Sequence, residues 1–349
     1  MNLKKLISWS QNEFSDLPWR KNRNLYRTLV SEIMLQQTTV GTVKNHFEKF
    51  LQRFKTLEDL AMASEEELLI AWKGLGYYRR ARNLKKIAEY LLRNVKGEFP
   101  KTTQELQSIP GIGPYTSQAI VAIGRDERGL AVDANLERVI SRLYGLKEEK
   151  GLKLQKKIYE LFNSNNILNI GSLSYRALNE ALMDLGRTYC QARKTSCELC
   201  PLNKDCVAYQ EGMPLKYPIG KNIIKKPSIE HEIHLLRLII IKNDKILVYK
   251  KSEKEWLSGQ YEVPTLIISS TDKKLNQYPR LKSEIEFSGK NFKSGITKYT
   301  ISNLVVKIQQ KNLEKLGFHL KTEWRELDEN ANLSTASYKA IKLFMGSIL

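Results

Sequence analysis

Cysteine is scarce in this chain, and all of it lies in one short segment. The 349 residues include four cysteines, and every one falls between Cys190 and Cys206. None is left elsewhere, so disulfides cannot form a framework across the fold. Cysteines clustered in this way are typical of a metal site rather than of disulfide bonds.

The sequence also lacks a long apolar run. Residues 1–14 carry two lysines and no apolar core of the kind found in a secretory signal, so we expect no export signal. The most apolar later run, 235–241, is interrupted by Arg237 and is too short to span a bilayer. We therefore expect a cytoplasmic protein associated with the nucleoid, and no membrane partner.

Acidic residues are outnumbered. Lys and Arg total 57 against 38 Asp and Glu, which gives a formal net charge of +19. A positive field of this kind attracts polyanions, so the charge favours nucleic acid as a partner over a merely basic, solvated surface. The length of the chain suggests two domains, and a hydrophobic content of 42% is enough for buried cores.

Helical patterns dominate residues 1–210. Apolar residues recur at helical spacing over 25–34 and 84–91, which predicts two helices. Ser64 and Glu67 fit a capping box at the start of a third helix. The first domain is therefore expected to be mainly α.

A segment rich in Gly, Pro and Lys, residues 211–228, predicts a linker. Its lysines leave two alternatives open, a flexible tether and a segment that lies along DNA. Residues 229–349 have a mixed pattern, with strands expected at 233–241, 246–250 and 299–308. Asn243-Asp244 would turn the chain between the first two strands. We expect a smaller α+β domain here.

The cysteine spacing narrows the choice of metal. Cys190, Cys197, Cys200 and Cys206 leave gaps of six, two and five residues. Four thiolates can hold either zinc or an iron–sulfur cluster. Zinc sites more often contain two closely spaced pairs, and only one such pair is present, so the spacing favours iron–sulfur. A structural clip is the default role for such a group.

Residues 109–116, Ile-Pro-Gly-Ile-Gly-Pro-Tyr-Thr, lie between two helical segments. Gly111 and Gly113 let the backbone approach a partner closely. A helix that begins near Pro114 would offer unpaired N–H groups to a phosphate oxygen. This is the helix-hairpin-helix pattern, which sets register on DNA without reading its sequence.

Together with Val-Asp-Ala-Asn at 132–135, these motifs resemble the base-excision glycosylase superfamily that includes endonuclease III. In members that also cut the DNA strand, a lysine follows the hairpin and attacks the sugar as a Schiff-base nucleophile. This chain has Tyr115 at that position. The resemblance therefore implies an enzyme that removes a base and has little or no lyase activity.

Within that superfamily the chain is similar to the MutY adenine DNA glycosylases. The similarity covers about residues 9–210 and rests on LPWR at 17–20, SEIMLQQT at 31–38 and GLGYYR at 74–79. It implies a monomer with a 4Fe-4S cluster that hydrolyses the N-glycosidic bond of adenine mispaired with 8-oxoguanine or guanine in double-stranded DNA. An endonuclease III-like glycosylase-lyase and a non-catalytic DNA-binding homologue remain as alternatives.

The resemblance assigns the chemistry to two carboxylates, Glu32 and Asp133. Glu32 would protonate adenine and then activate water, with partial burial raising its pKa. Taken alone, it is better explained as a surface residue of an amphipathic helix. Asp133 would stabilise or capture the sugar cation, and it also fits a helix N-cap whose bonds keep a carboxylate ionised. Asn135 and Tyr115 would position water and sugar.

Other residues would contact DNA by the same resemblance. Adenine must leave the double helix to be reached, and Gln37 and Tyr77 match the wedge residues that fill the gap. Packing within the protein is the alternative for both. Trp19, Arg20 and Glu180 match positions of the adenine pocket, although Trp19 equally fits a core aromatic.

Residues 229–349 resemble the Nudix-like domain that reads 8-oxoguanine in this family. Residues 256–264 match one of its motifs, but the spaced glutamates of a Nudix box are absent, so we expect binding without hydrolysis. The family usually has Phe-Ser-His in its reading loop, and this chain keeps only Ser302. Ser302 and Asn303 can still hydrogen-bond a base edge, with an ordinary strand as the alternative.

Overall fold

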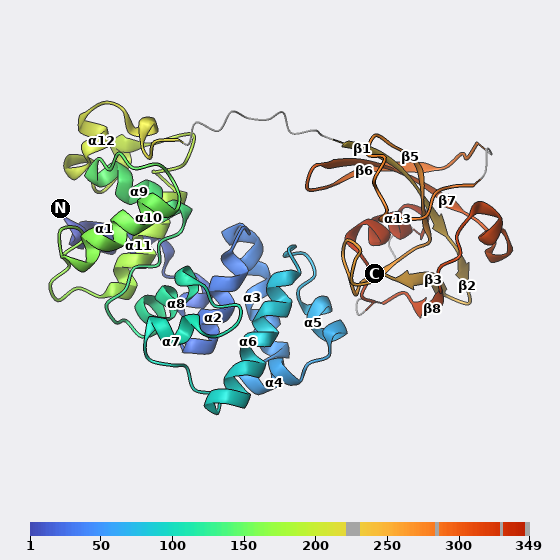
Figure 1. The fold of residues 1–349 in the computed structure, drawn as a ribbon, viewed down its shortest axis with the longest axis horizontal. Helices are drawn as coiled ribbons and strands as arrows, with labels where there is room; N and C mark the ends of the chain where they lie inside the picture. The colour runs from blue at the N-terminus through green and yellow to red at the C-terminus, as the bar shows by residue number, and fades with distance from the viewer. Residues whose placement is uncertain (221–230, 283–285, 329–330, 346–349) are drawn as a thin grey trace. The chain divides into compact units, whose positions relative to one another are not determined.

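The structure, a computed structural model, describes residues 1–220, 231–282, 286–328 and 331–345. They group into two compact units, one made of Met1–Ala63 and Leu75–Ile224 and the other of Ser64–Gly74 and Lys225–Leu349. The first unit is helical, and the second holds all the described strands (Figure 1). The prediction of a mainly α part followed by a smaller α+β part is confirmed.

The first unit is built from short helices with polar N-caps. Asn24 caps α2, Thr102 caps α7 and Asp133 caps α9, each accepting a backbone N–H of the first turn. The helices are α1 (Leu3–Phe14), α2 (Leu25–Leu35), α3 (Val40–Arg53), α4 (Leu57–Met62), α6 (Arg79–Val95), α7 (Thr103–Gln107), α8 (Pro114–Ala119), α9 (Ala134–Tyr144), α10 (Leu152–Asn163), α11 (Tyr175–Arg187) and α12 (Val207–Gln210), with the short turns η1 (Pro18–Arg20) and η2 (Ile120–Gly124).

One large apolar cluster holds α1, α9, α10 and α11 together. The helix α11 packs against α1 and α9, and buries Leu178, Leu182 and Leu185 in the cluster. The polar residues Asn179 and Asp184 of α11 are also buried. No described helix is both long enough and apolar enough to cross a membrane.

The predicted capping box is present in α5 (Glu65–Ala71), where the Ser64 and Glu67 side chains each bond the other residue's backbone N–H. The helix predicted over 84–91 is part of α6. It ends at Val95, and its C-cap Lys96, one residue before Gly97, has a left-handed conformation with φ 53°. The capping box therefore marked the start of α5 correctly, whereas α6 extends beyond the predicted range at both ends.

Residues 211–220, predicted to begin a linker, instead pack onto the first unit. Tyr217 is buried in the apolar cluster of that unit. Its hydroxyl donates to Glu211 at 2.8 Å, and its carbonyl accepts a bond from Arg142 at 3.0 Å. A buried aromatic ring with both polar groups satisfied anchors this segment. The rest of the predicted linker, residues 221–228, lies outside the described residues.

The second unit contains two four-stranded sheets. The first has the order β5-β1-β7-β6, with β1 parallel to β7, and the second joins β2, β3, β4 and β8. Asn243 and Asp244 both have positive φ and turn β2 into β3, as predicted. The strands are β1 (His231–Ile239), β2 (Ile241–Lys242), β3 (Lys245–Lys250), β4 (Tyr261–Glu262), β5 (Thr265–Ser270), β6 (Lys290–Ile296), β7 (Tyr299–Lys307) and β8 (Glu323–Glu326), followed by α13 (Thr335–Met345).

Charged side chains are buried in the core of the second unit. Glu262 is fully buried and lies 3.4 Å from Arg237 and 3.8 Å from Lys251. Tyr249 and Ser334 donate hydroxyl hydrogen bonds to the same carboxylate. The glutamate of the motif at 256–264 therefore neutralises buried cations.

Glu262→Gln should strongly destabilise the protein. The substitution keeps the shape of the side chain but leaves Arg237 and Lys251 buried beside a neutral amide, which costs about 3 kcal/mol or more. Urea unfolding of the full chain, followed by tryptophan fluorescence, measures the loss. Glu326→Gln is the matched control, since Glu326 pairs with Lys245 at the surface and its loss should change stability by less than about 1 kcal/mol. Equal losses in the two variants would contradict this account.

Candidate active site

Glu32 lies in the middle of α2 and is buried, with 4% of its surface exposed. The sequence predicted only partial burial, at the edge of an amphipathic helix. The difference arises because α2 is contacted by α3, α6, α8 and η2, which leave no solvent-facing side at this position. A carboxyl group is therefore enclosed within the first unit.

Tyr115 contacts Glu32 directly. The tyrosine is the second residue of α8, immediately after the hairpin, and its hydroxyl donates to Glu32 Oε2 at 2.5 Å. Gly111 of the hairpin has φ 101°, a conformation that favours glycine, and Pro114 starts the helix at its first position. The hairpin geometry thus delivers the tyrosine to the buried carboxyl.

The environment of Glu32 favours its protonated form. Burial raises the pKa of Glu32 to about 7, against the opposing hydrogen bond from Tyr115. The negative charges of Glu180 and Asp133 raise this pKa further, and the positive charge of Arg23 lowers it. A carboxyl with a pKa near neutrality can both give and take a proton under physiological conditions.

Asp133 is the N-cap of α9, as predicted. Its Oδ1 accepts the backbone N–H groups of Asn135 at 2.9 Å and Leu136 at 2.8 Å, and its Oδ2 accepts the Asn135 side-chain amide at 2.8 Å. These bonds favour the carboxylate, but burial outweighs them, so the pKa of Asp133 is raised above its usual range. The cap alone therefore does not set the charge state of this residue.

A chain of hydrogen bonds runs from Asp133 to the cysteine segment. Asn135 accepts a bond from Arg138 at 2.9 Å, and Arg138 Nε donates to the backbone carbonyl of Cys190 at 2.7 Å. Sequence reasoning missed Arg138. The sequence did contain a signal for it, because Arg138 follows Asn135 by three positions and therefore lies on the same face of the helix. In the structure Arg138 donates both to Asn135 and to the Gly186 carbonyl of α11.

The four cysteines come together around one largely apolar cavity, and none forms a disulfide. Arg142 also lines this cavity and donates to Cys190 Sγ at 3.3 Å. Burial raises the pKa of the Cys200 thiol to about 12. Among the described residues, no three His, Cys, Asp or Glu side chains converge closely enough to hold a single metal ion. All four cysteines thus line the same cavity.

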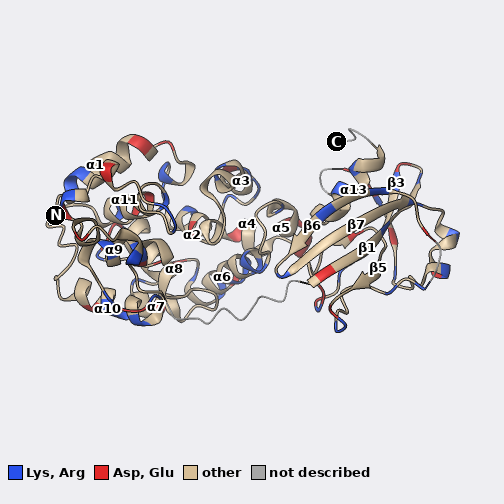
Figure 2. Cartoon of the chain, turned by 90° about the horizontal axis from the view of Figure 1, so that it is seen from above, with Lys and Arg blue, Asp and Glu red and all other residues tan. Residues whose placement is uncertain are grey.

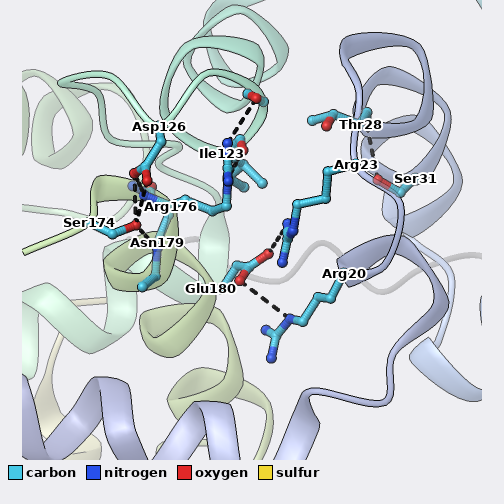
Figure 3. A network of polar contacts seen from close by, with 12 residues as sticks. Arg20, Arg23, Thr28, Ser31, Ile123, Asp126, Ser174, Arg176, Asn179 and Glu180 are labelled. Atoms are coloured by element: carbon cyan, nitrogen blue, oxygen red, sulfur yellow. Dashed lines mark hydrogen bonds and ion pairs between the residues drawn. The ribbon is translucent and has the colours of Figure 1, made fainter.

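Two of the predicted base-pocket residues, Arg20 and Glu180, line one cavity, and Trp19 is not among its lining residues. Trp19 is half-buried, and its ring packs edge-to-face on Phe47 with the centroids 5.9 Å apart. Glu180 of α11 lies between Arg20 and Arg23 (Figure 3). A cavity of about 270 Å³ is lined by these two arginines, Glu180, Arg176, Ala177, Gln11, Ser15 and Ser174.

The predicted wedge residues are both exposed. Gln37 and Tyr77 have positive φ values of 55° and 46°, so each backbone turns its side chain out at a loop tip. Arg80 binds both loops from inside: it donates to the Met34 and Leu75 carbonyls at 2.8 and 2.9 Å. Tyr77 is 62% exposed, although the Arg80 guanidinium lies 5.6 Å from its ring centroid, so most of its surface is open to a partner. Sequence reasoning did not single out Arg80.

The hairpin leaves space in front of its second glycine. A Cβ atom at Gly113 would meet nothing within 4 Å, and no side chain caps α8. The backbone N–H groups there are open to an anion. Figure 2 shows Lys and Arg along the helices of the first unit and in the second unit, in keeping with the net charge of +19.

In the second unit, only one of two predicted contacts remains available to DNA. Asn303 is 1% exposed; it accepts a bond from Arg237 at 2.7 Å and donates to Ser294 at 2.9 Å. The prediction that it reads a base edge is wrong, because its amide is committed to the core. Ser302 is half-buried on β7, in register with the exposed His234 and Lys293 on the neighbouring strands.

Glu32→Gln should stabilise the protein in a pH-dependent way. Folded Glu32 binds its proton more tightly than the unfolded chain does, so its contribution to stability falls as pH rises from 4.5 to about 7. Above that range the buried charge costs about 3 kcal/mol, which the amide avoids. Urea unfolding at pH 5 and pH 8 should show the advantage of the variant growing by that amount.

Tyr115→Phe provides the complementary control. It removes the hydrogen bond that opposes the rise in the pKa of Glu32, so the loss of stability should continue to higher pH. An advantage of Glu32→Gln that is the same at both pH values would contradict the raised pKa.

Comparison with known proteins gives a consistent picture. A family model described as HhH-GPD superfamily base excision DNA repair protein matches residues 30–164. The adenine DNA glycosylase of Buchnera aphidicola subsp. Acyrthosiphon pisum is 35% identical over 253 residues, 72% of this chain and 69% of that protein. The human adenine DNA glycosylase is 36% identical over 234 residues, 64% of this chain and 42% of that protein.

A solved structure shows the same fold. The structure of a thermostable thymine-DNA glycosylase, 29% identical, covers 60% of this chain and 95% of its own, with a TM-score of 0.52. The family match includes Glu32, the hairpin and Asp133. The chain therefore belongs to the adenine DNA glycosylase family within the helix-hairpin-helix superfamily, and it is a DNA glycosylase of base excision repair.

Proposed function

We propose that this chain hydrolyses the N-glycosidic bond of adenine mispaired with 8-oxoguanine or guanine in double-stranded DNA. The observation that carries the proposal is the enclosed Glu32 carboxyl, which has a pKa of about 7 and a tyrosine hydroxyl 2.5 Å away. The names of the related proteins support adenine as the base. Tyr115 stands where a lyase has its lysine, so base removal would leave the sugar-phosphate strand intact.

The first step is departure of the base. Protonated Glu32 donates its proton to a ring nitrogen of adenine, and the C1′–N9 bond breaks with its electron pair leaving on the base. The sugar is left as an oxocarbenium ion, and Glu32 is left as a carboxylate. The hydrogen bond from Tyr115 compensates part of the cost of that buried charge.

The second step adds water. The Glu32 carboxylate accepts a proton as the water oxygen attacks C1′, which returns Glu32 to its starting state. Asp133 stabilises the positive charge on the sugar until the attack is complete. Asn135, held by Arg138, orients the Asp133 carboxylate. The product is an abasic site and free adenine.

Base capture would use the cavity lined by Arg20, Arg23 and Glu180. Ligand sites of ~300–1,000 Å³ hold drug-sized molecules, so the cavity of about 270 Å³ suits a smaller group such as one base. Trp19, Arg20 and Glu180 would surround the adenine, while Gln37 and Tyr77 fill the gap in the double helix. Ser302 would contact the opposite strand, and Gly111 and Gly113 a phosphate. The enzyme would act as a monomer at the cytoplasmic nucleoid.

The cysteines would hold a 4Fe-4S cluster. The four thiols line one cavity, and their spacing in the sequence, with a single close pair, favours an iron–sulfur cluster over zinc. When bound, the cluster would supply four iron–thiolate bonds that clip residues 190–206 together. Arg142, which donates to Cys190 Sγ, would stabilise its thiolate.

Excision is tested on a duplex with a single adenine opposite 8-oxoguanine or guanine. We expect an alkali-labile site at the adenine, formed faster opposite 8-oxoguanine. Glu32→Gln should slow excision by about 10²–10⁴-fold, because the proton donor is lost. Glu160→Gln, an exposed glutamate on α10, is the control and should have no effect.

The alternatives give different results in the same assay. No alkali-labile site at adenine with the wild-type protein would refute the proposal. Borohydride trapping as efficient as that of a true lyase would favour a glycosylase-lyase. Equal activity in wild type and Glu32→Gln would favour a non-catalytic DNA-binding protein.

The metal is identified by analysis of the purified protein. We expect iron and acid-labile sulfide, with an absorbance shoulder near ~400 nm. Cys197→Ser should lose iron and lower the melting temperature, because the clip opens. Zinc without iron would rule out the cluster.

A further inference from the structure

Arg23 makes a close contact that the two proposed catalytic steps do not use. It lies in the loop between η1 and α2, and its guanidinium donates to Glu180 Oε1 at 2.6 Å. Arg20 approaches the other oxygen, Glu180 Oε2, with its Nε at 3.5 Å. Figure 3 shows the Glu180 carboxylate between the two guanidinium groups. The three side chains line the same cavity.

The other arginines of the cavity make their described hydrogen bonds to residues other than Glu180. Arg20 donates to Asp184 at 2.9 Å and to the Phe14 carbonyl at 3.2 Å, and its Nε has no hydrogen bond within the described structure. Arg176 donates to the Ile123 and Gly124 carbonyls at 2.6 and 3.0 Å. The short bond that holds Glu180 therefore comes from Arg23.

Holding this carboxylate matters because of what lies beside it. Both Glu180 and Asp133 act on Glu32 through space and raise its pKa, while Arg23 lowers it and Tyr115 lowers it by hydrogen bonding. Without Arg23, Glu180 would keep only the longer ion pair with Arg20 among the contacts described for it, and its carboxylate would be held less firmly toward a bound base. The ion pair thus affects both the geometry and the charge around Glu32.

We propose that Arg23 is a positioning residue of the glycosylase: it holds the Glu180 carboxylate toward the base pocket and compensates its charge beside Glu32. Fixed in this way, Glu180 accepts a hydrogen bond from a donor on the base edge, such as the exocyclic amine of adenine. This inference rests on the proposed function of Glu32 as the proton donor.

A double-mutant cycle tests whether Arg23 acts through Glu180. Single-turnover excision is measured for wild type, Arg23→Ala, Arg23→Lys, Glu180→Gln and the Arg23→Ala/Glu180→Gln double variant. Arg23→Ala should slow excision roughly tenfold, and Arg23→Lys should restore most of the rate because it retains the charge. In the Glu180→Gln background, Arg23→Ala should add less than about threefold. Fully additive effects would overturn the proposal.

The pH dependence separates this role from a purely structural one. Excision requires protonated Glu32, so the wild-type rate falls as pH rises through about 7. Loss of the Arg23 charge raises the pKa of Glu32, so the alkaline limb of Arg23→Ala should move to higher pH while its maximum rate falls. Lys44→Ala, which removes an exposed ion pair with Asp16, should change neither the maximum rate of excision nor the pH at which the rate falls. If Arg23→Ala excises adenine more slowly but its rate falls at the same pH as that of wild type, the proposal is contradicted.

Failure of the inference and failure of the proposed function are distinguishable. If the wild-type protein excises adenine and Glu32→Gln does not, but Arg23→Ala matches wild type, only the role of Arg23 is refuted. If wild type is inactive, infrared titration of the protonated Glu32 carboxyl still tests the role of Arg23. The carboxyl band is identified because it disappears in Glu32→Gln. An upward shift of that titration in Arg23→Ala supports the electrostatic role, and no shift overturns it.

Discussion

The active site depends on one buried contact, the hydrogen bond from Tyr115 to Glu32. A carboxyl group removed from water favours its neutral form unless something compensates its charge. Here the only close polar contact described for the carboxyl is a hydroxyl group, which lowers the cost of ionisation without removing it. The carboxyl is therefore poised between its two protonation states, which general acid–base catalysis at neutral pH requires.

A comparison within the chain shows how specific that arrangement is. Glu262 in the second unit is buried as deeply as Glu32, but Arg237 and Lys251 lie beside it. Two buried cations beside the carboxylate make it a structural counter-ion. The partner of a buried glutamate, and not burial alone, separates a reactive carboxyl from a structural one. The negative charges of Glu180 and Asp133 raise the pKa of Glu32 further and so favour its protonated form.

The site also extends beyond its two carboxylates. Asp133 is linked through Asn135 and Arg138 to the backbone of Cys190, so the geometry of α9 and that of the cysteine segment are coupled. A cluster that closes this segment would hold the far end of the chain of bonds in place. A purely structural metal clip can in this way affect catalysis without touching substrate.

The sequence by itself determined what depends on neighbouring residues. The Asp133 cap, the capping box of Ser64 and Glu67, and the turn at Asn243-Asp244 follow from bonds between residues at most three apart, so local signals were enough. The hairpin and cysteine motifs were equally visible, because each is contained in a short segment. What those motifs would do came from their resemblance to a family.

Only the tertiary structure decided which side chains were free to react or to bind. Full burial of Glu32 comes from helices far along the chain, and its contact with Tyr115 spans 83 positions. Arg237 takes Asn303 out of reach of DNA across 66 positions, and Arg23 pairs with Glu180 across 157. Contacts over such separations depend on how whole helices and strands pack. No local pattern of residues specifies that packing, so the full burial of Glu32, its contact with Tyr115 and the loss of the Asn303 contact emerged only with the fold.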